Sequence, residues 1–538
     1  MPETFDYVIV GAGSAGCALA ARLSEQRDIT VLLIEAGPND ASWRIDMPLA
    51  VDSLLTNDRF SWPFKSEPLQ NAKQRVICQP RGRVLGGSSS INGMVYTRGH
   101  PLDYDHWANE HGCKGWSYAD VLPYFKRMEH APWGDPTYRG INGPIKISRE
   151  TSNLSPLSAA LITGGVRVGL PYTSDYNGQF QEGITVEEQN IAGGKRCSAA
   201  RGYLTKEVRS RPNLRIWTGT WALQILIESK CARGVLVARN GKDEIVYARR
   251  ETILCSGSIG SPHLLMLSGI GPAKQLIENG IKVVHDNDAI GGNLQDHPLI
   301  KMRFRCKKGI GLSRFASGPA KIVAGLNWFL FKTGVTAKNH FEAGGYVRTN
   351  STHTKPNVKF ELFPLALTGD LHKPYAFESF QIVLTSQNSQ SRGKLILTSN
   401  SVYDPPKIEL NYLDKPEDFQ TFTESVALTR KIIATPEFQA LDALEIDPGP
   451  GVVDGPAMID WVKDTISTAY HTSGTCRMGP AEISGNVVDP QLRVIGIENL
   501  RVADASIQPV VVSANTNATS MMIGERAADL IRMSNYRV

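Results

Sequence analysis

The sequence predicts an α/β domain of parallel strands and helices, joined to a second, α+β domain that is built on an antiparallel sheet. Three observations predict this fold class. The chain opens with a strand–glycine–helix–strand unit at residues 5–37, and a second strand–glycine–helix junction follows at residues 252–268. After residue 307, short alternating strands follow one another without helices between them, which favours antiparallel pairing.

The composition is that of an ordinary globular protein and excludes several classes. The 538 residues are 41% hydrophobic and 21% charged, which is enough chain for two or more domains. The net charge of +5 comes without any basic block, so nucleic acid is not a predicted partner. Eight scattered cysteines without a CxxC pair argue against a disulfide framework or a structural zinc site, and no other metal site is predicted.

The sequence also bears on the location of the protein. The scattered cysteines favour a reducing compartment, and the first strand begins so early that no room is left for a secretory leader. No apolar run approaches the length of a membrane span. We therefore expect a cytoplasmic protein without a membrane span, and leave peripheral contact with a membrane open. The sequence does not determine the oligomeric state.

The opening unit has the pattern of a dinucleotide site. An apolar run leads into GAGSAG at residues 11–16, a helical segment follows, and a second apolar run ends in Glu35. Gly11 permits the tight turn, Gly13 lets the backbone approach a pyrophosphate, and Gly16 lets helix and strand pack closely. Free N–H groups at the start of the helix then face the phosphates. A carboxylate at position 35 accepts from a ribose 2′-hydroxyl, which disfavours NADP but does not separate NAD from FAD.

A second loop rich in small residues lies at residues 82–93, GRVLGGSSSING. Such residues permit close approach of the backbone to a planar or phosphorylated ligand. A flexible surface loop would have the same composition. The apolar residues Val84, Leu85 and Met94–Tyr96 within and after the loop would anchor it in a core, so we favour a ligand loop.

Asn240-Gly241 is a hairpin signal between two strands, at residues 235–238 and 244–248. A separate short strand is expected at Thr252–Cys255. It runs into a glycine- and serine-rich junction, with Pro262 in the first turn of a helix that reaches Ser268. The junction either serves ordinary α/β packing or faces the same cofactor as the first, and position alone does not choose.

The middle of the chain has a different pattern of apolar and polar residues. Residues 322–331 are an apolar helix candidate. The strand at residues 358–362 alternates apolar residues with Lys359 and Glu361, which predicts one face turned to water. A further strand at residues 380–384 and a helix after Pro416 complete a separate α+β domain.

Taken together, the motifs resemble those of the glucose–methanol–choline (GMC) oxidoreductases. GAGSAG with LIEAG is similar to the FAD fingerprint of that family, and further blocks match across nearly the whole chain in the expected order. In chain order these blocks are residues 82–92, residues 257–271 (GSIGSPHLLMLSGIG), residues 292–298 (GNLQDHP), residues 470–479 and residues 504–519. Residues 339–345, NHFEAGG, are similar to the choline-dehydrogenase-like and alkanol-dehydrogenase-like branch.

The resemblance implies a Rossmann-like FAD-binding domain of the GMC type, interrupted by an inserted α+β substrate domain on an antiparallel sheet. We place the FAD-binding domain at residues 1–158, 196–306 and 462–538, and the substrate-binding domain at residues 159–195 and 307–461. By motif matching, the implied cofactor-binding residues are Gly11, Gly13, Ser14, Ala15, Gly16, Glu35, Ala36, Arg83, Val84, Gly87, Ser88, Asn92, Gly93, Met94, Val95, Ser256, Gly257, Asp504, Ala505, Asn515, Thr516 and Asn517.

The resemblance also implies an activity, the oxidation of a primary alcohol to the aldehyde by hydride transfer to FAD. His471 corresponds to the catalytic base of the family and Asn515 to its second catalytic residue, although a lone histidine is more often structural. Some relatives link FAD covalently through a histidine just before the asparagine of the first signature. Ile91 stands at that position here, so we expect non-covalent FAD.

Substrate and acceptor are less determined. Glu342 matches the position at which choline-oxidising relatives place a carboxylate, and Trp62 and Tyr470 offer aromatic faces to a cation. We favour a structural role for Glu342, with choline only one candidate alcohol. The branch implies a dehydrogenase with a non-oxygen, quinone-type or unknown acceptor. The alternatives are an oxidase that releases hydrogen peroxide, an FAD-containing hydroxynitrile lyase, and a flavin-binding module without catalysis.

Overall fold

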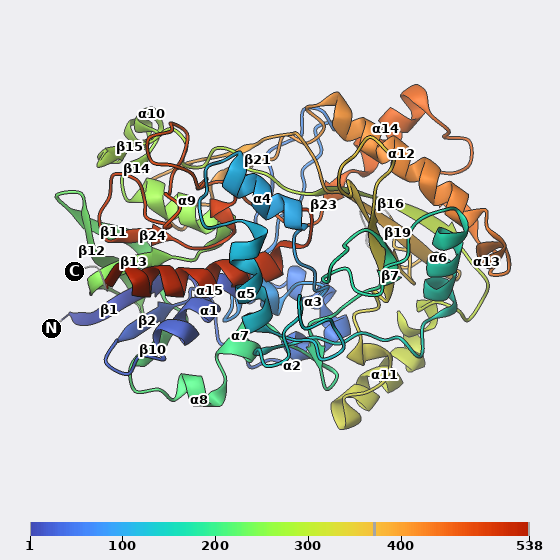
Figure 1. Cartoon of the computed structure of the whole chain (residues 1–538), viewed down its shortest axis with the longest axis horizontal. Helices are drawn as coiled ribbons and strands as arrows, with labels where there is room; N and C mark the ends of the chain where they lie inside the picture. Colours follow the sequence, from blue (N-terminus) through green and yellow to red (C-terminus); the bar gives the residue numbers. More distant parts are fainter. Residues whose placement is uncertain (1, 369–372, 536–538) are drawn as a thin grey trace.

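The computed structural model describes residues 2–368 and 373–535. Figure 1 shows two lobes along the long axis of the molecule, each built around a seven-stranded sheet. Strand β1 (Glu3–Val10) lies in the left lobe, and strands β16 (Pro298–Arg305) and β19 (Ser379–Ser386) lie in the right lobe. The predicted fold class, an α/β domain combined with a domain on an antiparallel sheet, is confirmed.

The left sheet is mainly parallel. Four parallel pairings join five strands around β1 and β13, and a meander of antiparallel strands extends the sheet on one side. The strands in spatial order are β10 (Leu214–Trp217), β2 (Val31–Ile34), β1, β13 (Lys242–Leu254), β12 (Cys231–Arg239) and β11 (Trp221–Glu228), with β24 (Leu500–Val502) paired to the end of β13.

The predicted hairpin is present in this meander. Arg239 pairs with Lys242, and the two turn residues Asn240 and Gly241 have φ values of 52° and 75°. Positive φ at both positions is the geometry that an Asn-Gly turn favours. The expected separate strand at residues 252–255 is the end of β13 instead, because one continuous strand pairs first with β12 and then with β24.

The right sheet is antiparallel throughout its pairings. Its buried face forms a second hydrophobic core, separate from that of the left lobe. The strands in spatial order are β22 (Leu444–Asp447), β16, β19, β18 (Val358–Phe363), β17 (Ala343–Val347) and β7 (Gly183–Val186), with β23 (Ser467–Thr468) paired to β16.

Most strands of the two sheets fall inside the domain segments expected for them, but two do not. Every strand of the parallel-sheet lobe falls in the segments expected to bind the cofactor. Strand β16 lies inside the segment 196–306 and β23 lies inside the segment 462–538, yet both pair in the antiparallel sheet. We therefore propose that the substrate domain begins before Pro298 rather than after residue 306.

The two ends of the chain pack together in the left lobe. Helix α1 (Ser14–Leu23) lies against α15 (Thr516–Asn535), so closely that a Cβ on Gly524 would lie 2.3 Å from the carbonyl oxygen of Ala15. The guanidinium of Arg22 pairs with the buried carboxylate of Glu525 at 2.9 Å. Cofactor residues predicted at opposite ends of the sequence are thereby placed side by side.

The helix after the second glycine junction is longer than expected. It is α9 (Gly257–Leu267), which begins at a glycine with φ +79° and carries Pro262 in its interior. Proline cannot donate to the carbonyl four residues earlier. That carbonyl, Ser258 O, accepts instead from Thr475 Oγ1 at 2.6 Å. The expectation that Pro262 lies in the first turn is wrong: it lies in the second turn, where a side chain from the C-terminal region replaces the missing hydrogen bond.

The remaining elements are short or lie outside the two sheets. The other helices are α2 (Trp43–Asp46), α3 (Asp52–Leu55), α4 (Pro101–Asn109), α5 (Tyr118–Met128), α6 (Pro156–Arg167), α7 (Ala199–Tyr203), α8 (Lys206–Arg209), α10 (Ala273–Glu278), α11 (Gly318–Phe331), α12 (Pro416–Ile433), α13 (Pro436–Gln439) and α14 (Gly455–Thr465). The two-stranded pairs are β3 (Ser61–Trp62) with β4 (Arg81–Gly82), β5 (Glu129–His130) with β6 (Ile145–Lys146), β8 (Ile191–Ala192) with β9 (Lys195–Arg196), β14 (Ile270–Gly271) with β15 (His285–Asp286), and β20 (Lys394–Ile396) with β21 (Lys407–Glu409).

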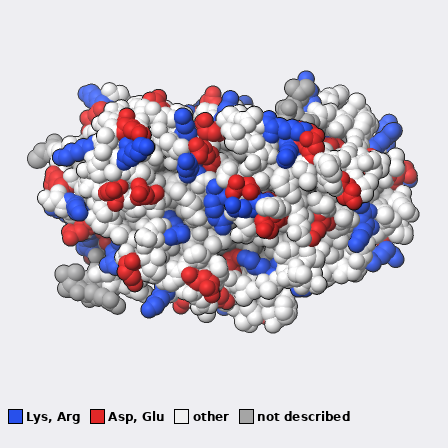
Figure 2. Space-filling model, turned by 90° about the horizontal axis from the view of Figure 1, so that it is seen from above, with Lys and Arg blue, Asp and Glu red and all other residues white. Residues whose placement is uncertain are grey.

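Two further features concern helix hydropathy and surface charge. Within residues 2–368 and 373–535, no helix combines the length and apolar character that a membrane crossing requires. Figure 2 shows the face at the top of Figure 1, where basic and acidic side chains are intermixed rather than gathered into a patch of one sign.

Candidate active site

The first glycine turn is tightly built. Gly11 has φ +101°, and a Cβ there would lie 2.5 Å from the carbonyl oxygen of Cys255. A Cβ on Gly16 would lie 2.0 Å from the carbonyl oxygen of Gly11. Both positions therefore exclude any side chain, as the dinucleotide pattern predicts.

The N-terminus of α1 is open to a ligand. Gly13 is its N-cap, and among the described residues no side chain caps it and no acidic residue lies in its first turn. Uncapped N–H groups at a helix N-terminus are a site for phosphate oxygens. Ser14 Oγ donates to Asn517 Oδ1 at 2.8 Å, so the start of α15 meets the start of α1.

Glu35 lies at the end of β2 and faces the same turn. Its Oε2 accepts from the N–H of Ala12 at 3.1 Å, and its Oε1 accepts from the N–H of Gly37 at 2.9 Å. Burial raises the pKa of Glu35 to about 7, against the opposing effect of these two hydrogen bonds. Each oxygen keeps a second acceptor position for a ribose hydroxyl.

The second glycine loop lies directly on the first. The N–H of Gly86 donates to Ala12 O at 2.8 Å. Gly87 has φ +54°, and a Cβ there would lie 2.7 Å from Gly13 Cα. Residues 82–93 and 11–16, which the sequence separates by about 70 positions, thus form one surface.

The second strand–glycine–helix junction joins this surface as well. Ser256 Oγ donates to Val10 O at 3.0 Å. The carboxylate of Asp504 accepts from the N–H of Gly257 at 2.8 Å and from Ser261 Oγ at 2.6 Å, and it caps the turn that begins at Ala505. Both predicted junctions are therefore neighbours, and Asp504 connects the second one to the C-terminal segment.

Many predicted cofactor residues share a further property. They are partly accessible, although the strands that carry them into the site are buried. These residues are Gly11, Gly13, Ser14, Ala36, Arg83, Asn92, Gly93, Ser256, Gly257, Asn515 and Asn517. Ala505 is partly accessible as well. The other predicted positions are buried, with Ser88 exposed beside the loop: Ala15, Gly16, Val84, Met94, Val95 and Thr516.

His471 and Asn515 meet as the spacing of the motifs implies. Nδ2 of Asn515 lies 3.3 Å from Nε2 of His471, although the residues are 44 positions apart. Asn515 directly precedes α15, and its backbone N–H donates to Thr97 Oγ1 at 3.2 Å.

Two residues of the GNLQDHP block hold His471. The carboxylate of Asp296 accepts from the backbone N–H of His471 at 2.7 Å, and also from the hydroxyls of Tyr412 at 2.5 Å and Thr468 at 2.7 Å. Nδ1 of His297 lies 3.0 Å from Nδ1 of His471, with the two rings nearly perpendicular. The imidazole of His471 is therefore located at both its backbone and its ring.

A buried lysine contacts Asn515 from the antiparallel sheet. Lys359 of β18 donates to Asn515 Oδ1 at 2.9 Å and to Glu361 at 2.8 Å, and its ammonium lies 3.5 Å from Glu187. The residue is only 2% exposed. The predicted water-facing side of this strand is thus wrong: that face of β18 turns toward His471 and Asn515.

These contacts determine hydrogen positions around the pair. A lysine ammonium only donates, so the oxygen of the Asn515 amide faces Lys359 and its NH₂ faces His471. Nε2 of His471 then accepts, and the proton of the neutral ring lies on Nδ1, pointing at His297. The lone pair of Nε2 is left on the side of Asn515.

The charges around the pair favour a neutral imidazole. Burial lowers the pKa of His471 well below its usual value, and His297, Lys359 and Arg81 lower it further. Burial also lowers the pKa of His297, to about 4. Burial would lower the pKa of Lys359 as well, but Glu187 and Glu361 raise it above its usual value, so Lys359 remains a cation.

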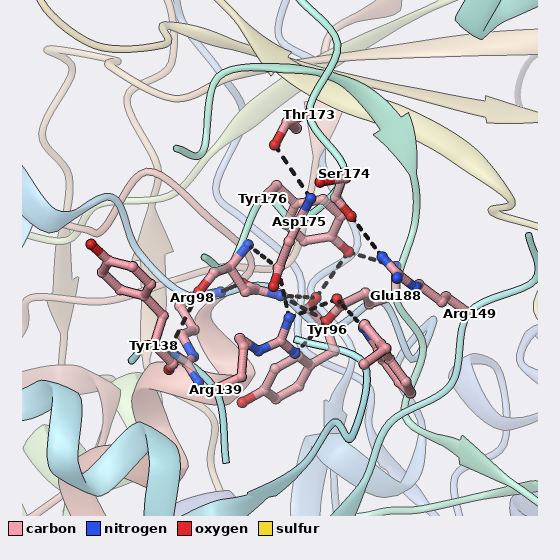
Figure 3. A network of polar contacts seen from close by, with 12 residues as sticks. Tyr96, Arg98, Tyr138, Arg139, Arg149, Thr173, Ser174, Asp175, Tyr176 and Glu188 are labelled. Carbon is pink, nitrogen blue, oxygen red and sulfur yellow. Dashed lines mark hydrogen bonds and ion pairs between the residues drawn. The ribbon is translucent and has the colours of Figure 1, made fainter. Parts of the chain in front are cut away.

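A buried ionic network supports the chain beside Asn515. Figure 3 shows Arg139 between Asp175 and Glu188, with Arg98 and Tyr96 next to them. Arg98 and Arg139 share the carboxylate of Glu129, at 2.5 and 2.8 Å. Thr97 lies between Tyr96 and Arg98, so the network holds the residue whose hydroxyl contacts Asn515.

The three predicted substrate residues, among the described contacts, make no hydrogen bond, ion pair or ring contact with one another. Tyr470 precedes His471 and is 41% exposed. Trp62 packs against Phe64 and Trp221, and the guanidinium of Arg83 lies over its ring. Glu342 is buried at the start of α6.

The contacts of Glu342 explain its position. Its Oε2 accepts from the N–H of Ser155 at 3.0 Å and from Ser158 Oγ at 3.1 Å, and its Oε1 lies 3.9 Å from the ammonium of Lys338. An anion at a helix N-terminus is stabilised by the unpaired N–H groups there. This placement supports the structural role favoured from the sequence.

Sequence reasoning missed Asp296, His297, Lys359 and Glu187 as parts of the site. His297 and Asp296 stand in a block that matched the family, and a histidine there was an available signal. Lys359 carried no such signal, because alternation with apolar residues is also the pattern of a solvated strand.

The fold and the site together define a dinucleotide-binding protein of the oxidoreductase type. Its histidine–asparagine pair lies where the two lobes meet. The comparisons with known proteins agree. Residues 5–299 and 389–524 match the two parts of the GMC oxidoreductase family. The chain belongs to this family, and it is an FAD-dependent oxidoreductase of alcohol-type substrates.

Curated relatives cover nearly the whole chain. The oxygen-dependent choline dehydrogenase of Brucella ovis is 42% identical over 526 residues, which are 98% of this chain and 95% of the relative. The protein of the same name from Rhizobium etli is 44% identical over 526 residues, again 98% and 95% of the two chains.

Solved structures agree in fold. Pyridoxine 4-oxidase from Mesorbium loti has a TM-score of 0.89 at 31% identity, covering 98% of this chain and 99% of that one. A variant of formate oxidase from Aspergillus oryzae has a TM-score of 0.92 at 27% identity, covering 100% and 99%. The accessible glycine surface, the open N-terminus of α1 and Glu35 fit the FAD that this family binds.

Proposed function

We propose that this protein oxidises a primary alcohol to the aldehyde, with His471 as the base and Asn515 as the group that holds the substrate oxygen. The observation that carries the proposal is the chain of contacts from Lys359 through Asn515 to His471. It presents a lone pair and an N–H donor at the same point, which is what the deprotonation of an alcohol requires.

Each residue of the site has a separate role in the proposed reaction. The alcohol hydroxyl replaces the N–H of Asn515 at Nε2 of His471, which then accepts the hydroxyl proton. The lowered pKa of this histidine keeps it neutral and competent at pH 7. One N–H of the Asn515 amide faces His471, and the second is available to the oxygen that gains negative charge. FAD, when bound, supplies the two-electron oxidant that takes the hydride.

His297 and Asp296 act on the base without touching the alcohol. Asp296 holds the backbone of His471, and His297 accepts from Nδ1 and so keeps the lone pair on Nε2. The low pKa of His297 keeps it neutral and able to accept. We therefore assign both as positioning residues.

The substrate is proposed as a primary alcohol of undefined side chain. The name of the curated relatives makes choline one candidate. Against a dedicated ammonium site stands the position of Glu342, whose carboxylate is engaged by Ser155 and Ser158, and the separation of Trp62 into another aromatic cluster. An uncharged primary alcohol therefore belongs in the same test.

Two acceptors are proposed for the electrons. The choline-dehydrogenase-like branch implies a non-oxygen acceptor, with a quinone type as the candidate. The relatives are named oxygen-dependent, and two structural neighbours are oxidases, which favours oxygen as the alternative. Peroxide formed under air in proportion to the alcohol consumed would decide for oxygen.

We further propose that FAD is held without a covalent bond and that the protein resides in the cytoplasm. Ile91 stands at the position where some relatives attach FAD, and its side chain is buried in a small cluster with Val84 and Phe60. It offers no nucleophile to the flavin. Seven of the eight cysteines are buried and all are unpaired, as expected in a reducing compartment.

The test is anaerobic mixing of the FAD-loaded protein with a panel of alcohols that includes choline, followed by oxygen. Bleaching of the flavin absorbance by at least one primary alcohol is expected. A panel without any bleaching would refute the proposal and would favour the hydroxynitrile lyase alternative, which needs no net reduction of FAD. The Asn515→Ala variant should bleach more slowly by about tenfold or more, because the donor to the substrate oxygen is lost.

A further inference from the structure

Helix α11 leaves most of its apolar surface uncovered. It extends over 14 residues, Gly318–Phe331, at the lower right edge of the molecule in Figure 1. Only Ala324 and Trp328 are buried among them. Six large apolar side chains are exposed, with these fractions: Ile322 66%, Val323 65%, Leu326 56%, Phe329 47%, Leu330 71% and Phe331 67%. A contiguous apolar patch of this kind marks an interaction surface.

The helix is nevertheless fixed to the molecule. Ala324 and Trp328 are four residues apart and so lie on one face. Trp328 Nε1 donates to Gly194 O at 2.7 Å, and Thr336 Oγ1 donates to Ala324 O at 3.0 Å. The ring of Trp43, itself 43% exposed, packs on Phe329 at 5.4 Å. The opposite face is therefore held outward rather than free to fold back.

The segment that carries the patch has charges of one sign. Residues 307–341 contain six basic residues and no acidic residue. The basic residues are Lys307, Lys308, Arg314, Lys321, Lys332 and Lys338, of which Lys338 pairs with Glu150 at 3.1 Å. An apolar face bordered by lysine and arginine complements a layer of anionic headgroups over an apolar interior.

A cavity of ≈ 330 Å³ lies beside the helix and adds to this complementarity. Its walls include Trp328, Phe329 and the cationic side chains of Lys195, Arg201 and Lys332, with Asp46 as the one carboxylate. Asp46 pairs with Arg201 at 2.9 Å, so the lysines remain to attract an anion. The cavity borders α11 through Trp328 and Phe329.

We propose that α11 binds to the surface of a bilayer that contains anionic lipid, with its exposed face in the interfacial layer. At 1.5 Å per residue the helix is about 21 Å long, too short to cross a hydrocarbon core of about 30 Å. It therefore lies along the surface rather than across it. A protein partner or a second copy of this chain would need acidic groups to match the basic border, and this border is what makes lipid the favoured occupant.

The helix leads back to the active site. The chain continues from α11 to Asn339, whose Nδ2 donates to Gly93 O at 2.8 Å in the second glycine loop. A bilayer docked on α11 would thus lie near the cofactor domain, where an apolar alcohol or a lipid-soluble acceptor would be supplied. The binding proposal itself stands whatever the acceptor is.

Flotation of the FAD-loaded protein with vesicles tests the proposal. We expect most of the protein to float with vesicles of equal parts phosphatidylglycerol and phosphatidylcholine, and about tenfold less with phosphatidylcholine alone. The variant Ile322→Ser with Leu326→Ser and Leu330→Ser should lose binding by about tenfold or more. A matched variant, Phe180→Ser with Val453→Ser and Ile483→Ser, removes equally exposed apolar side chains elsewhere and should float like the parent.

A second variant separates charge from apolar contact. Lys308→Gln with Arg314→Gln and Lys321→Gln should abolish the preference for phosphatidylglycerol. FAD content and thermal melting, measured on every variant, show that each is folded. Equal flotation of the parent and the Ile322, Leu326 and Leu330 variant would overturn the proposal. So would a parent that elutes as a dimer without binding vesicles and becomes a monomer in that variant, because the face would then be covered by a second copy.

Discussion

At the scale of single residues, the orientation of one amide decides what the active site presents. The two ends of the Asn515 side chain have nearly the same shape, but only one of them can face an ammonium. Lys359 therefore places the NH₂ group toward His471, and His471 then keeps its lone pair on Nε2. A lysine from the antiparallel sheet thus sets the hydrogen positions of two residues from the C-terminal segment.

Replacing Lys359 tests this dependence. Lys359→Met removes a positive charge that lowers the pKa of His471, so that pKa should rise. Because the base must be neutral, the fall of kcat/KM on the acid side should move to higher pH, and flavin reduction should slow by about tenfold or more. A pH profile of flavin reduction measures both. Lys301→Met, which alters β16 of the same sheet, is the control and should keep the parental profile.

The base itself is tested by His471→Ala. Loss of the proton acceptor should lower the turnover number by about two or more orders of magnitude, with the FAD absorbance of the purified protein unchanged. In the unchanged protein, the fall of kcat/KM on the acid side should lie below pH 6.5, because the pKa of His471 is lowered from that value. Turnover close to that of the parent would remove His471 from the mechanism.

Prediction from sequence succeeded for residues in motifs and failed for residues without one. His471 and Asn515 were both expected from family motifs, and the structure places them in contact. Lys359 was expected in water because lysine alternates with valine and phenylalanine in its strand. The alternation was correct, but β17 and β19 flank this strand and its polar face meets the other lobe, so that face is buried. Periodicity predicts which residues share one face of a strand, but it does not predict which element packs against that face.

At the scale of elements, two glycine loops form the cofactor surface by direct contact. Gly87 approaches Gly13 Cα so closely that a methyl group does not fit, and Gly86 donates to Ala12. Close packing of two loops removes side chains from the place where a pyrophosphate approaches. The composition of each loop was readable in the sequence, whereas their contact was not.

Gly87→Ala tests the contact, with Gly193→Ala as its matched control. Both glycines have nearly the same positive φ, +54° and +55°, but only Gly87 has an atom within 4 Å of the added Cβ. The control should lose roughly 1–2 kcal/mol of stability for the left-handed backbone alone. Gly87→Ala should lose more and should bind FAD about tenfold or more weakly. Thermal melting and FAD titration measure these effects, and equal losses in the two variants would refute the steric argument.

At the scale of the whole molecule, the cofactor site is assembled from both ends of the chain. Helix α1 packs on α15, and Ser14 donates to Asn517 across 503 positions of sequence. Such distant contacts form only when the complete chain is folded, so FAD and the fold should stabilise each other. The antiparallel sheet contributes Lys359 to the same site from the other lobe.

FAD release tests this assembly. Acid precipitation should leave all of the yellow colour in the supernatant, because Ile91 cannot form a bond to the flavin. The apoprotein prepared under mild conditions should melt at a lower temperature than the FAD-loaded protein, and excess FAD should restore the higher value. Colour retained by the precipitate would contradict non-covalent binding.

The sequence by itself determined the two lobes, the glycine loops and the family, because these depend on local patterns of strands, turns and motif residues. Only the tertiary structure decided that Lys359 orients Asn515, that Glu342 accepts hydrogen bonds at the start of α6 and that α11 exposes its apolar face. Each of these three features depends on which element packs against the side chain concerned. The spacing of residues along the chain does not determine that packing, because it is set only when the two sheets come together.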